Sequence, residues 1–584
     1  MAIRIPLFAL ASSLSLAACA PLPMAGPPAA PPVPASTPHR ADNAPVDGPG
    51  LVSAADPRAA AAGAQMLQLG GSATDAAIAT MLALGVVEPQ SSGIGGGGFI
   101  VMGDAAGKVE TIDGREAAPA AATPTWFYAE GLPMPIREAI PGGRSVGVPG
   151  NLRLAALAHT KHGKLAWRTL FEPAIRLARD GFAITPRLNA SLAMFKETAA
   201  LDPAARALFF DPAGNALPVG TVVKNPALAA TLERIAGRGA DAFYSGDNAA
   251  TIAAKVGTSP INPAPMTTAD IAAYRAIERP PVCGTYRAHH ICSMGPPSAG
   301  GIIVIQALGQ LERFDLKAMG QNSPVAWHLI AESERLAFAD RDRFIADPGL
   351  VSVPTPGLID PSYIAARSAL ISEKATLPAV QPGSPAGAGA DYAMAGPVDE
   401  HGTTHFVAVD RDGAVASYTS TVESGFGSGL MANGYYLNNE LTDFNIVPMR
   451  DGKPTANRVE GGKRPRSSMS PVVVYGPDGT LRMAVGGAGG MTIPVQVIRA
   501  IIGTLDWGLS AREALGLGVV MPMGDMLGVE QGTALEGMIP ALQALGHAQV
   551  RAMPLRLKAN AIERVGNSWR GAADPRSEGA SVTP

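Results

Sequence analysis

The stretch DEHGTTHFVAVDRDG, residues 399–413, sets a glycine and two threonines directly before a run of strand-forming residues. The run THFVAVD, residues 404–410, is predicted to be a strand because its pattern has a period of two. Threonine favours strands and glycine favours the turn that enters one, so the Gly402-Thr403-Thr404 junction has an ordinary structural explanation by itself. Whether it does more depends on the rest of the chain.

The composition limits the class of protein to which this stretch belongs. The chain has 584 residues, of which 47% are apolar and 16% charged, with 67 Gly and 52 Pro. These values indicate a compact, loop-rich globular protein, long enough for roughly two or three average domains or for one large catalytic unit. A formal net charge of -3 and the lack of a Lys/Arg cluster in the sequence argue against a nucleic-acid partner.

The N-terminus reads as a targeting segment over residues 1–18. Arg4 supplies the positive end, a short apolar stretch follows, and LAAC ends at Cys19. This tetrapeptide resembles a bacterial lipobox, which implies cleavage before Cys19 and lipid attachment to it. The alternative is an ordinary secretory signal with a chance cysteine.

The segment that follows fits a tether. Residues 19–50 are rich in Pro and Ala and should form an extended spacer, so the folded part begins near Leu51. We therefore expect an exported, periplasmic lipoprotein that touches the membrane only through its lipid.

Two further cysteines, Cys283 and Cys292, lie in VCGTYRAHHICSM. If the chain turns at Arg287-Ala288, a hairpin sets the two cysteines opposite each other. An oxidising compartment permits a disulfide there, but buried free cysteines are equally ordinary. The sequence leaves both states open.

The period of the apolar pattern changes near Thr403. Upstream we expect helices in PRAAAAGAQMLQLGG (57–71), SATDAAIATMLALGVV (72–87) and WHLIAESERLAFADRDRFI (327–345). Downstream we expect strands over residues 404–410, 414–422, 434–440, 470–476 and 481–487. The second half is thus predicted to contribute sheet.

The glycine-rich run SGIGGGGF, residues 92–99, contains the spelling of a dinucleotide-binding loop. That loop requires a strand before it and a helix after it, whereas here a helical pattern precedes and the strand-like FIVMGD follows. No nucleotide cofactor is predicted. The glycines are instead expected to let one backbone approach another at the centre of the fold.

A series of blocks occurs in the order in which similar blocks occur in gamma-glutamyltranspeptidases. They are EPQSSGIGGGGF, DGREAAPA, GGRSVGVPG, FEPAIRLARDGF, MGPPSAGG, AFADRDRF, HGTTHFVAVD, YLNNELTDF, KRPRSSMSP and AADPRS. The resemblance covers nearly everything from Leu51 to Arg576. It implies an α/β fold of the N-terminal-nucleophile hydrolase type, a four-layer αββα sandwich. It also implies a precursor that cuts itself into a large subunit, residues 51–402, and a small subunit, residues 403–584, which stay together as a heterodimer.

The resemblance gives the junction a chemical role. A threonine hydroxyl is a weak nucleophile, and one way to activate it is to place it at a chain N-terminus, where the α-amine serves as base. Thr403 would first attack the Gly402 carbonyl, and glycine tolerates the strained backbone that this requires. The freed Thr403 would then attack the γ-carbonyl of glutathione or a related compound. Water, an amino acid or a dipeptide would accept the γ-glutamyl group.

Further site residues follow from the resemblance, although each has an ordinary explanation as a strand or turn residue. Thr421 is implied to hydrogen-bond the nucleophile, and the amides of Gly489 and Gly490 to stabilise the oxyanion. Many relatives have Ser-Pro before this glycine pair, where this chain has Gly487-Ala488. That difference puts the stiffness of the loop in doubt.

Recognition of the glutamyl group is implied to use charged and hydroxyl side chains. Arg115, whose planar fork can hold both oxygens, is implied to bind the α-carboxylate together with Ser467 and Ser468. The α-ammonium would be held by three carboxylates: Asp443, Glu440 and Glu423. No cofactor and no metal are implied. The segment between Phe444 and Lys463 lacks an aromatic lid residue, so we expect an open site.

Two alternatives of function remain. Cephalosporin acylases share the fold and the nucleophile but act on a glutaryl side chain without an α-amine, so Asp443, Glu440 and Glu423 would lack a ligand. The second alternative is an inactive, surface-tethered binding lipoprotein that kept the scaffold. The catalytic base has an alternative too, because His405 lies two residues from Thr403.

Overall fold

The computed structural model describes residues 45, 46, 48, 50–389, 391–394 and 402–584. The predicted signal peptide, the lipidation site at Cys19 and nearly all of the tether lie outside these residues. The described residues belong to one unit, residues 38–584. None of their helices is long and apolar enough to cross a membrane.

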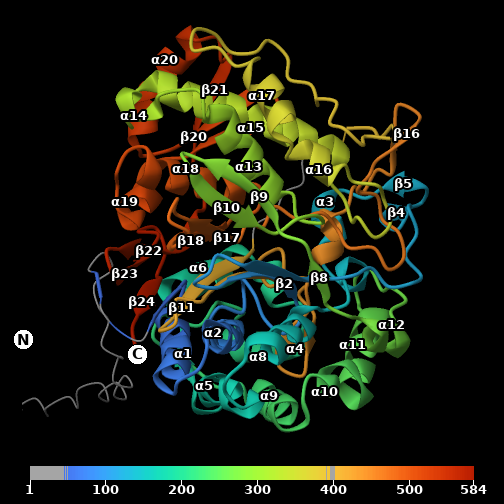
Figure 1. Cartoon of the computed structure of the whole chain (residues 1–584). Helices are drawn as coiled ribbons and strands as arrows, with labels where there is room; N and C mark the ends of the chain where they lie inside the picture. The colour runs from blue at the N-terminus through green and yellow to red at the C-terminus, as the bar shows by residue number, and fades with distance from the viewer. Residues whose placement is uncertain (1–44, 47, 49, 390, 395–401) are drawn as a thin grey trace, which may run out of the picture. The chain divides into compact units, whose positions relative to one another are not determined.

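Two antiparallel sheets form the centre of the fold (Figure 1). The first has the order β24 (Ala580–Val582), β1 (Gly50–Ala54), β11 (Thr404–Asp410), β12 (Val415–Thr421), β2 (Gly97–Gly103), β3 (Val109–Gly114), β8 (Ile277–Arg279). The second has the order β23 (Ser568–Ala573), β22 (Lys558–Val565), β18 (Leu481–Ala488), β17 (Val472–Tyr475), β10 (His289–Ser293), β9 (Val282–Tyr286).

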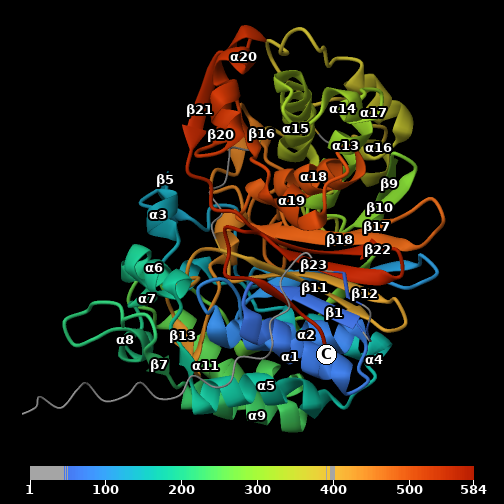
Figure 2. The ribbon, with the colours of Figure 1, turned by 90° about the vertical axis from the view of Figure 1, so that its left-hand side faces the viewer.

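The two sheets face each other and helices cover their outer faces, as Figure 2 shows. Val407 and Val409 of β11 pack between the sheets against Val473 and Ala484 of the other sheet. The first sheet is covered by α1 (Pro57–Gln68) and α2 (Ala73–Val87), with α5 (Trp167–Asp180) and α9 (Pro226–Arg238) beyond them. The second is covered by α13 (Gly300–Leu311) and α18 (Thr492–Leu505), with α15 (Pro324–Phe344) packed on α13. The predicted αββα sandwich is confirmed.

The predicted helices over 57–71, 72–87 and 327–345 are confirmed as α1, α2 and α15. Ser72 begins α2 by accepting a hydrogen bond from the backbone N–H of Asp75 at 3.1 Å, and the Asp75 side chain accepts from Ser72 in return. This reciprocal cap satisfies backbone donors that the first helical turn leaves without partners.

The prediction that the second half contributes sheet is confirmed, and strands from both halves alternate in the first sheet. β1 lies between β24 and β11, while β2 and β3 continue the sheet beyond β12. Every residue of β1 and β2 is buried. A strand covered on both faces need not alternate polar and apolar residues, and β1 was not predicted from the sequence.

The predicted strand over residues 434–440 is only partly correct. Tyr435 and Tyr436 form β14, paired with β13 (Met431–Ala432), and the chain then turns into the short 3₁₀ helix η2 (Glu440–Asp443). The Asn438 side chain accepts from Gly147 N–H and donates to the carbonyls of Gly95 and Gly147, which replaces ladder bonding by side-chain bonding. This turn places two candidate site residues on η2.

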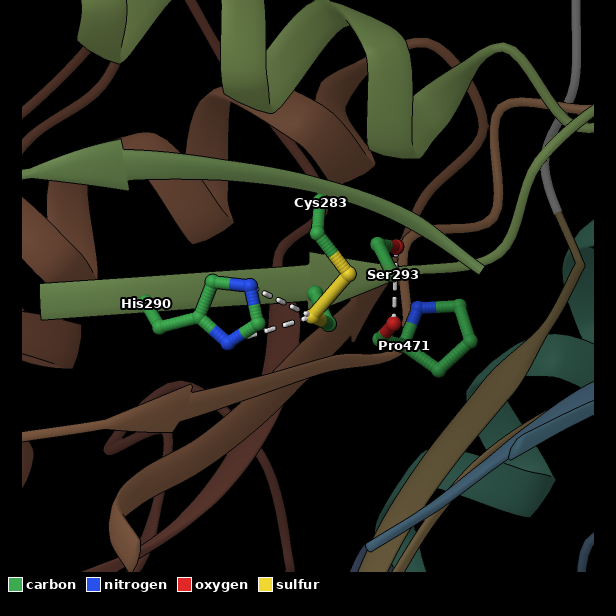
Figure 3. The surroundings of a disulfide bond; sticks show 5 residues. Cys283, His290, Ser293 and Pro471 are labelled. Atoms are coloured by element: carbon green, nitrogen blue, oxygen red, sulfur yellow. Dashed lines mark hydrogen bonds between the residues drawn. A yellow bond between two sulfur atoms is a disulfide. The ribbon is translucent and has the colours of Figure 1, made fainter. Parts of the chain in front are cut away.

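The hairpin β9–β10 has the predicted register, with Cys283 opposite Cys292. Arg287 and Ala288 form its turn with positive φ angles of 49° and 62°, the geometry that suits a two-residue hairpin. The two cysteines form a disulfide (Figure 3). The question that the sequence left open is therefore settled in favour of the disulfide, on the edge strand of the second sheet.

Candidate active site

The hydroxyls of Thr403 and Thr421 meet at the ends of two neighbouring strands. Thr403 directly precedes β11, Thr421 ends β12, and the Thr403 hydroxyl donates to the Thr421 hydroxyl at 3.3 Å. The Thr421 hydroxyl accepts from the backbone N–H of Glu423 at 2.7 Å. Both threonines are buried. The predicted pair is thus brought together by strand pairing, since Thr404 lies opposite Ser420 in the ladder.

The backbone at the Gly402–Thr403 bond is constrained. Thr403 has a φ of 153°, in a region that a β-branched residue rarely adopts. A Cβ atom at Gly402 would lie 2.0 Å from the carbonyl oxygen of Glu423, so only glycine fits there. Backbone strain of this kind is of the order of 1–3 kcal/mol per residue. The bond that the sequence predicts to break therefore carries strain in the intact chain.

The glycine pair Gly489-Gly490 follows β18 and leads into α18. Both residues have positive φ, 117° and 60°. Their carbonyls accept from the backbone N–H groups of Thr492 and Ile493, at 3.2 and 2.9 Å. Within the described part of the chain, no hydrogen-bond acceptor faces either glycine N–H. Two adjacent amides thus remain as donors for an incoming oxyanion.

Gly487-Ala488, the pair that replaces Ser-Pro, is held by the sheet. Both residues belong to β18 and pair with Ala559 and Lys558 of β22. The carbonyl of Ala488 also accepts from the Gln496 side chain at 2.8 Å. Strand pairing therefore fixes the start of the glycine loop without a proline.

Contacts between the sheets set this loop at the same end of the sandwich as Thr403. The His405 ring fills the space above Gly486, where a Cβ atom would lie 2.4 Å from the ring. Nearer the ends of these strands, Ala488 of β18 pairs with Lys558 of β22. The Lys558 ammonium donates to Glu88, and Glu88 also accepts from the Thr404 hydroxyl.

Arg115 follows β3 and lies in a buried acidic environment. Its Nη1 donates to Glu440 and its Nη2 to Asp443, both on η2. The carbonyls of Pro465 and Arg466 also accept from Arg115, at 3.2 and 2.8 Å. The structure thus brings together the predicted carboxylate-binding arginine and two of the predicted ammonium-binding acids. The arginine bonds both acids.

Several buried carboxyl groups lie around Arg115. Burial raises the pKa of Asp443 and of Glu440, with the Arg115 charge opposing the rise in both. Burial also raises the pKa of Glu116 to about 7, again opposed by Arg115. Glu423 adds a further carboxyl group close to Glu440. A bound cation would favour the charged form of these groups.

A metal ion is one cation that such a group attracts, and three of the carboxylates have a suitable spacing. The ligand atoms of Glu423, Glu440 and Asp443 lie within 4.8 Å of one another. The Arg115 guanidinium bonds two of these three carboxylates. In this arrangement Arg115 is the cation that they bind.

Ser467 and Ser468 lie beside Arg115. They directly follow Arg466, whose carbonyl accepts from Arg115. The Ser467 hydroxyl accepts from the backbone N–H of Met469 at 3.1 Å, and the Ser468 hydroxyl accepts from Arg341 of α15 at 3.3 Å. Both serines therefore directly follow the carbonyl that accepts from Arg115.

Sequence reasoning missed Glu116 and Arg341. Arg341 lies in the quoted block AFADRDRF, and its charge lowers the otherwise raised pKa of Asp443. Glu116 directly follows Arg115 and is fully buried. Both residues lie in blocks that resemble the family. Nothing else in the sequence marks them, because a charged side chain ordinarily indicates solvent exposure.

His405 is buried away from solvent and bonds Thr419. Its Nδ1 lies 2.9 Å from the Thr419 hydroxyl, and burial lowers the pKa of His405 to about 3. The ring is therefore neutral at neutral pH. Its hydrogen bond goes to β12 and not to the Thr403 hydroxyl, which is donated to Thr421.

The expectation of an open site concerns the mature enzyme and stays a prediction. In the intact chain none of the candidate residues with functional side chains is more than 5% exposed, and Thr403 is the most exposed of them. The segment after Phe444 forms the small hairpin β15 (Met449–Arg450) and β16 (Lys453–Pro454). Asn457, which follows it, donates to the carbonyl of Asp443 at 2.7 Å.

Comparisons with known proteins agree with this geometry. A profile of the family described as gamma-glutamyltranspeptidase matches residues 59–583. The glutathione hydrolase proenzyme of Bacillus subtilis (strain 168) is 35% identical over 553 residues, covering 91% of each chain. The acylase ACY 1 proenzyme of Pseudomonas sp. (strain SE83) is 34% identical, covering 94% of this chain and 96% of its own. The crystal structure of cephalosporin acylase from Bacillus halodurans superimposes with a TM-score of 0.81 at 26% identity, over 94% of this chain and 99% of that one. The chain therefore belongs to the gamma-glutamyltranspeptidase family.

Proposed function

We propose that the chain is a self-processing γ-glutamyltransferase and glutathione hydrolase with Thr403 as its nucleophile. The observation that carries the proposal is the buried Thr403–Thr421 pair, together with Arg115 bonded to buried carboxyl groups. The first feature supplies an acyl-transfer nucleophile and the second a site for a zwitterion. The relative named glutathione hydrolase proenzyme supports both the reaction and the processing.

Self-cleavage comes first in this proposal. The Thr403 hydroxyl attacks the carbonyl carbon of Gly402, the peptide C–N bond breaks as an ester C–O bond forms, and the released nitrogen becomes the α-amine. Water then hydrolyses the ester, which leaves a carboxylate on Gly402 and restores the hydroxyl. The positive φ at Thr403 and the tight fit at Gly402 support this step, because strain is relieved when the bond breaks. The products are residues up to 402 and residues 403–584.

The mature enzyme then transfers an acyl group. The Thr403 α-amine takes the hydroxyl proton as the oxygen attacks the γ-carbonyl of the donor. The amides of Gly489 and Gly490 stabilise the tetrahedral oxyanion. The leaving amine receives the proton, and a γ-glutamyl ester forms on Thr403. Attack by water gives glutamate, and attack by an amino acid or dipeptide gives the transfer product.

The donor's α-amino acid end exchanges partners with the protein. In the ligand-free chain Arg115 bonds Glu440 and Asp443. A glutamyl zwitterion brings one carboxylate for Arg115 and the two serines, and one ammonium for the three acids. Each buried charge therefore keeps a partner when the substrate enters, as buried ions require.

The acylase alternative has relatives in its favour, since both an acylase proenzyme and a cephalosporin acylase structure resemble the chain. A glutaryl group has a carboxylate but no ammonium, so it would leave Glu440 and Asp443 without their cation once it occupied Arg115. The cluster of buried carboxyl groups favours a γ-glutamyl donor.

The test compares γ-glutamyl-p-nitroanilide with glutaryl-p-nitroanilide on the purified enzyme, with a denaturing gel to follow cleavage. Two bands and a clear preference for the γ-glutamyl compound are expected. A preference for the glutaryl compound would move the chain to the acylases. No turnover of either, with binding retained, would leave a binding protein.

The N-terminal part of the proposal is an exported lipoprotein whose Cys19 carries the lipid and whose Pro/Ala-rich residues form the tether. The lipobox-like LAAC supports it. Labelling with a radioactive fatty acid in a bacterial host tests it. Cys19→Ala should abolish the label, and its persistence would place the lipid elsewhere.

A further inference from the structure

A buried ion pair lies directly behind the nucleophile. Glu88, at the C-terminal end of α2, accepts from the Thr404 hydroxyl at 3.1 Å and from the Lys558 ammonium at 2.9 Å through the same oxygen. Lys558 is the first residue of β22 and is 1% exposed. Its ammonium also donates to the Ser91 hydroxyl at 3.2 Å.

The loop that carries Glu88 and Ser91 contacts three parts of the candidate site. Thr404 follows the nucleophile and bonds Glu88. Val422, which follows Thr421, donates its backbone N–H to the carbonyl of Ser91 at 3.2 Å. Lys558 pairs with Ala488, the residue before the glycine pair. One loop therefore aligns the nucleophile strand, the Thr421 strand and the oxyanion loop.

The ion pair sets the electrostatics beside the chain end that self-cleavage creates. Glu88 bonds the side chain of Thr404, which is the residue directly after Thr403. The other charged groups that face it are Arg187, 3.9 Å from Glu88, and Asp56, which acts on Lys558. Along the two strands, His405 lies two residues after Thr403 and is neutral, and Glu423 lies two residues after Thr421.

We propose that Glu88 and Lys558 are a pair of positioning residues, which hold Thr404 and cancel each other's charge so that the Thr403 α-amine stays neutral during catalysis. The proposal rests on the proposed function, in which that amine is the base. Glu88 alone would favour the protonated amine, and Lys558 alone would favour the neutral one. Together they leave little net field at the amine while still aligning the strand.

The pH range over which the two charges offset each other is limited by the pKa of Lys558. Burial lowers the pKa of Lys558 to about 8, and the charge of Glu88 opposes the fall. Below that value the Lys558 ammonium is charged and can offset the Glu88 carboxylate to which it donates. Above it Lys558 loses its proton, and the Glu88 charge then acts on the amine without compensation.

The test uses Glu88→Gln, Lys558→Met and the double variant, all as the full self-processed enzyme. Two quantities are measured against pH: kcat/KM for γ-glutamyl-p-nitroanilide, and the rate at which acetic anhydride modifies the Thr403 α-amine, followed by mass spectrometry. The second readout does not depend on turnover. Arg179→Met, which removes an exposed charge, is the matched control.

Lys558→Met is expected to move the rising limb of both profiles to higher pH, and Glu88→Gln to lower pH, each by roughly half a unit to one unit. The double variant should return toward the wild-type position, and Lys558→Arg should keep it. Single variants that shift neither profile, or that shift both in the same direction, would overturn the proposal.

Two further outcomes separate this inference from the proposed function. If a single variant stays uncleaved, the double variant should recover cleavage, because it has no uncompensated buried charge; a double variant no better than the single ones would refute the charge balance. If the wild-type enzyme does not cleave, or does not turn over the γ-glutamyl compound, it is the proposed function that fails.

Discussion

The Thr403 hydroxyl donates to the Thr421 hydroxyl at 3.3 Å, across the adjoining ends of β11 and β12. This contact orients the Thr403 oxygen before any chain end exists, because the strand ladder holds both residues. It also gives a direct means of testing which oxygen breaks the chain.

Thr403→Ala is expected to run as one band on a denaturing gel, whereas the wild-type enzyme runs as two. Alanine has no hydroxyl to attack the Gly402 carbonyl, and Thr403→Ser, which keeps one, should still cleave. Intact mass spectrometry checks the site. A wild-type chain that remains whole after prolonged incubation would remove the self-cleavage step.

Gly402→Ala is expected to slow self-cleavage at least about tenfold, since relieving the overlap with the Glu423 carbonyl must shift the bond that reacts. Gly389→Ala is the matched control, because a Cβ atom there meets nothing within 4 Å. Cleavage time courses of the two variants give the comparison. Equal rates would show that the fit at Gly402 has no part in the reaction.

Arg115→Lys is expected to be processed normally and to raise KM for the γ-glutamyl compound. Lysine keeps the charge but not the fork that bonds Glu440 and Asp443, and a buried group left without its partner costs roughly 1–3 kcal/mol, or about 5- to 150-fold. Arg176→Lys, at an exposed arginine, serves as control. Unchanged kinetics in Arg115→Lys would place the substrate elsewhere.

His405→Asn is expected to keep the rising limb of the pH profile of kcat/KM. Burial holds the pKa of His405 at about 3, so the ring does not titrate in the range where an α-amine does. The variant is expected to lose stability, because the ring fills the space above Gly486. Loss of the limb with cleavage intact would make His405 the base.

Glu116→Gln is expected to remove a loss of stability that the wild-type enzyme shows as pH rises. The folded pKa of Glu116 is raised by burial from 4.5 to about 7, so its stabilising contribution is complete below pH 4.5 and is lost as pH rises through about 7. The Tm of the variant relative to wild type should therefore increase between pH 5 and pH 8. A difference that stays constant would assign the raised pKa to another group of the cluster.

The parts of this fold that the sequence predicts are those with a regular apolar spacing or a local cap. α1 and α2 could be predicted from helical spacing and from Ser72, and β11 from its period of two, although every residue of β11 is buried. β1 could not, because a fully buried strand need not alternate polar and apolar residues, and β2 was recognised only as the strand-like FIVMGD. The hairpin at Cys283 and Cys292 was predictable because its register depends only on the turn.

The candidate site divides in the same way. Thr403, Thr421 and Arg115 were recognised because they lie in blocks that resemble a known family. The bond between Glu88 and Lys558 joins residues 470 positions apart, and no local pattern relates them. Nor does the sequence show that Arg115 bonds Glu440 and Asp443 when no substrate is present, because that depends on burial.

The place of β1 between β24 and β11 also bears on how the chain is made. β1 is among the first described elements to leave the ribosome, whereas its partners β11 and β24 come late, β24 at the very end of the chain. Pairings between such distant segments form slowly, because a long loop must close before they stabilise anything. The first sheet therefore cannot be completed until residues 580–582 have been synthesised, so one edge of β1 stays without its partner strand until then.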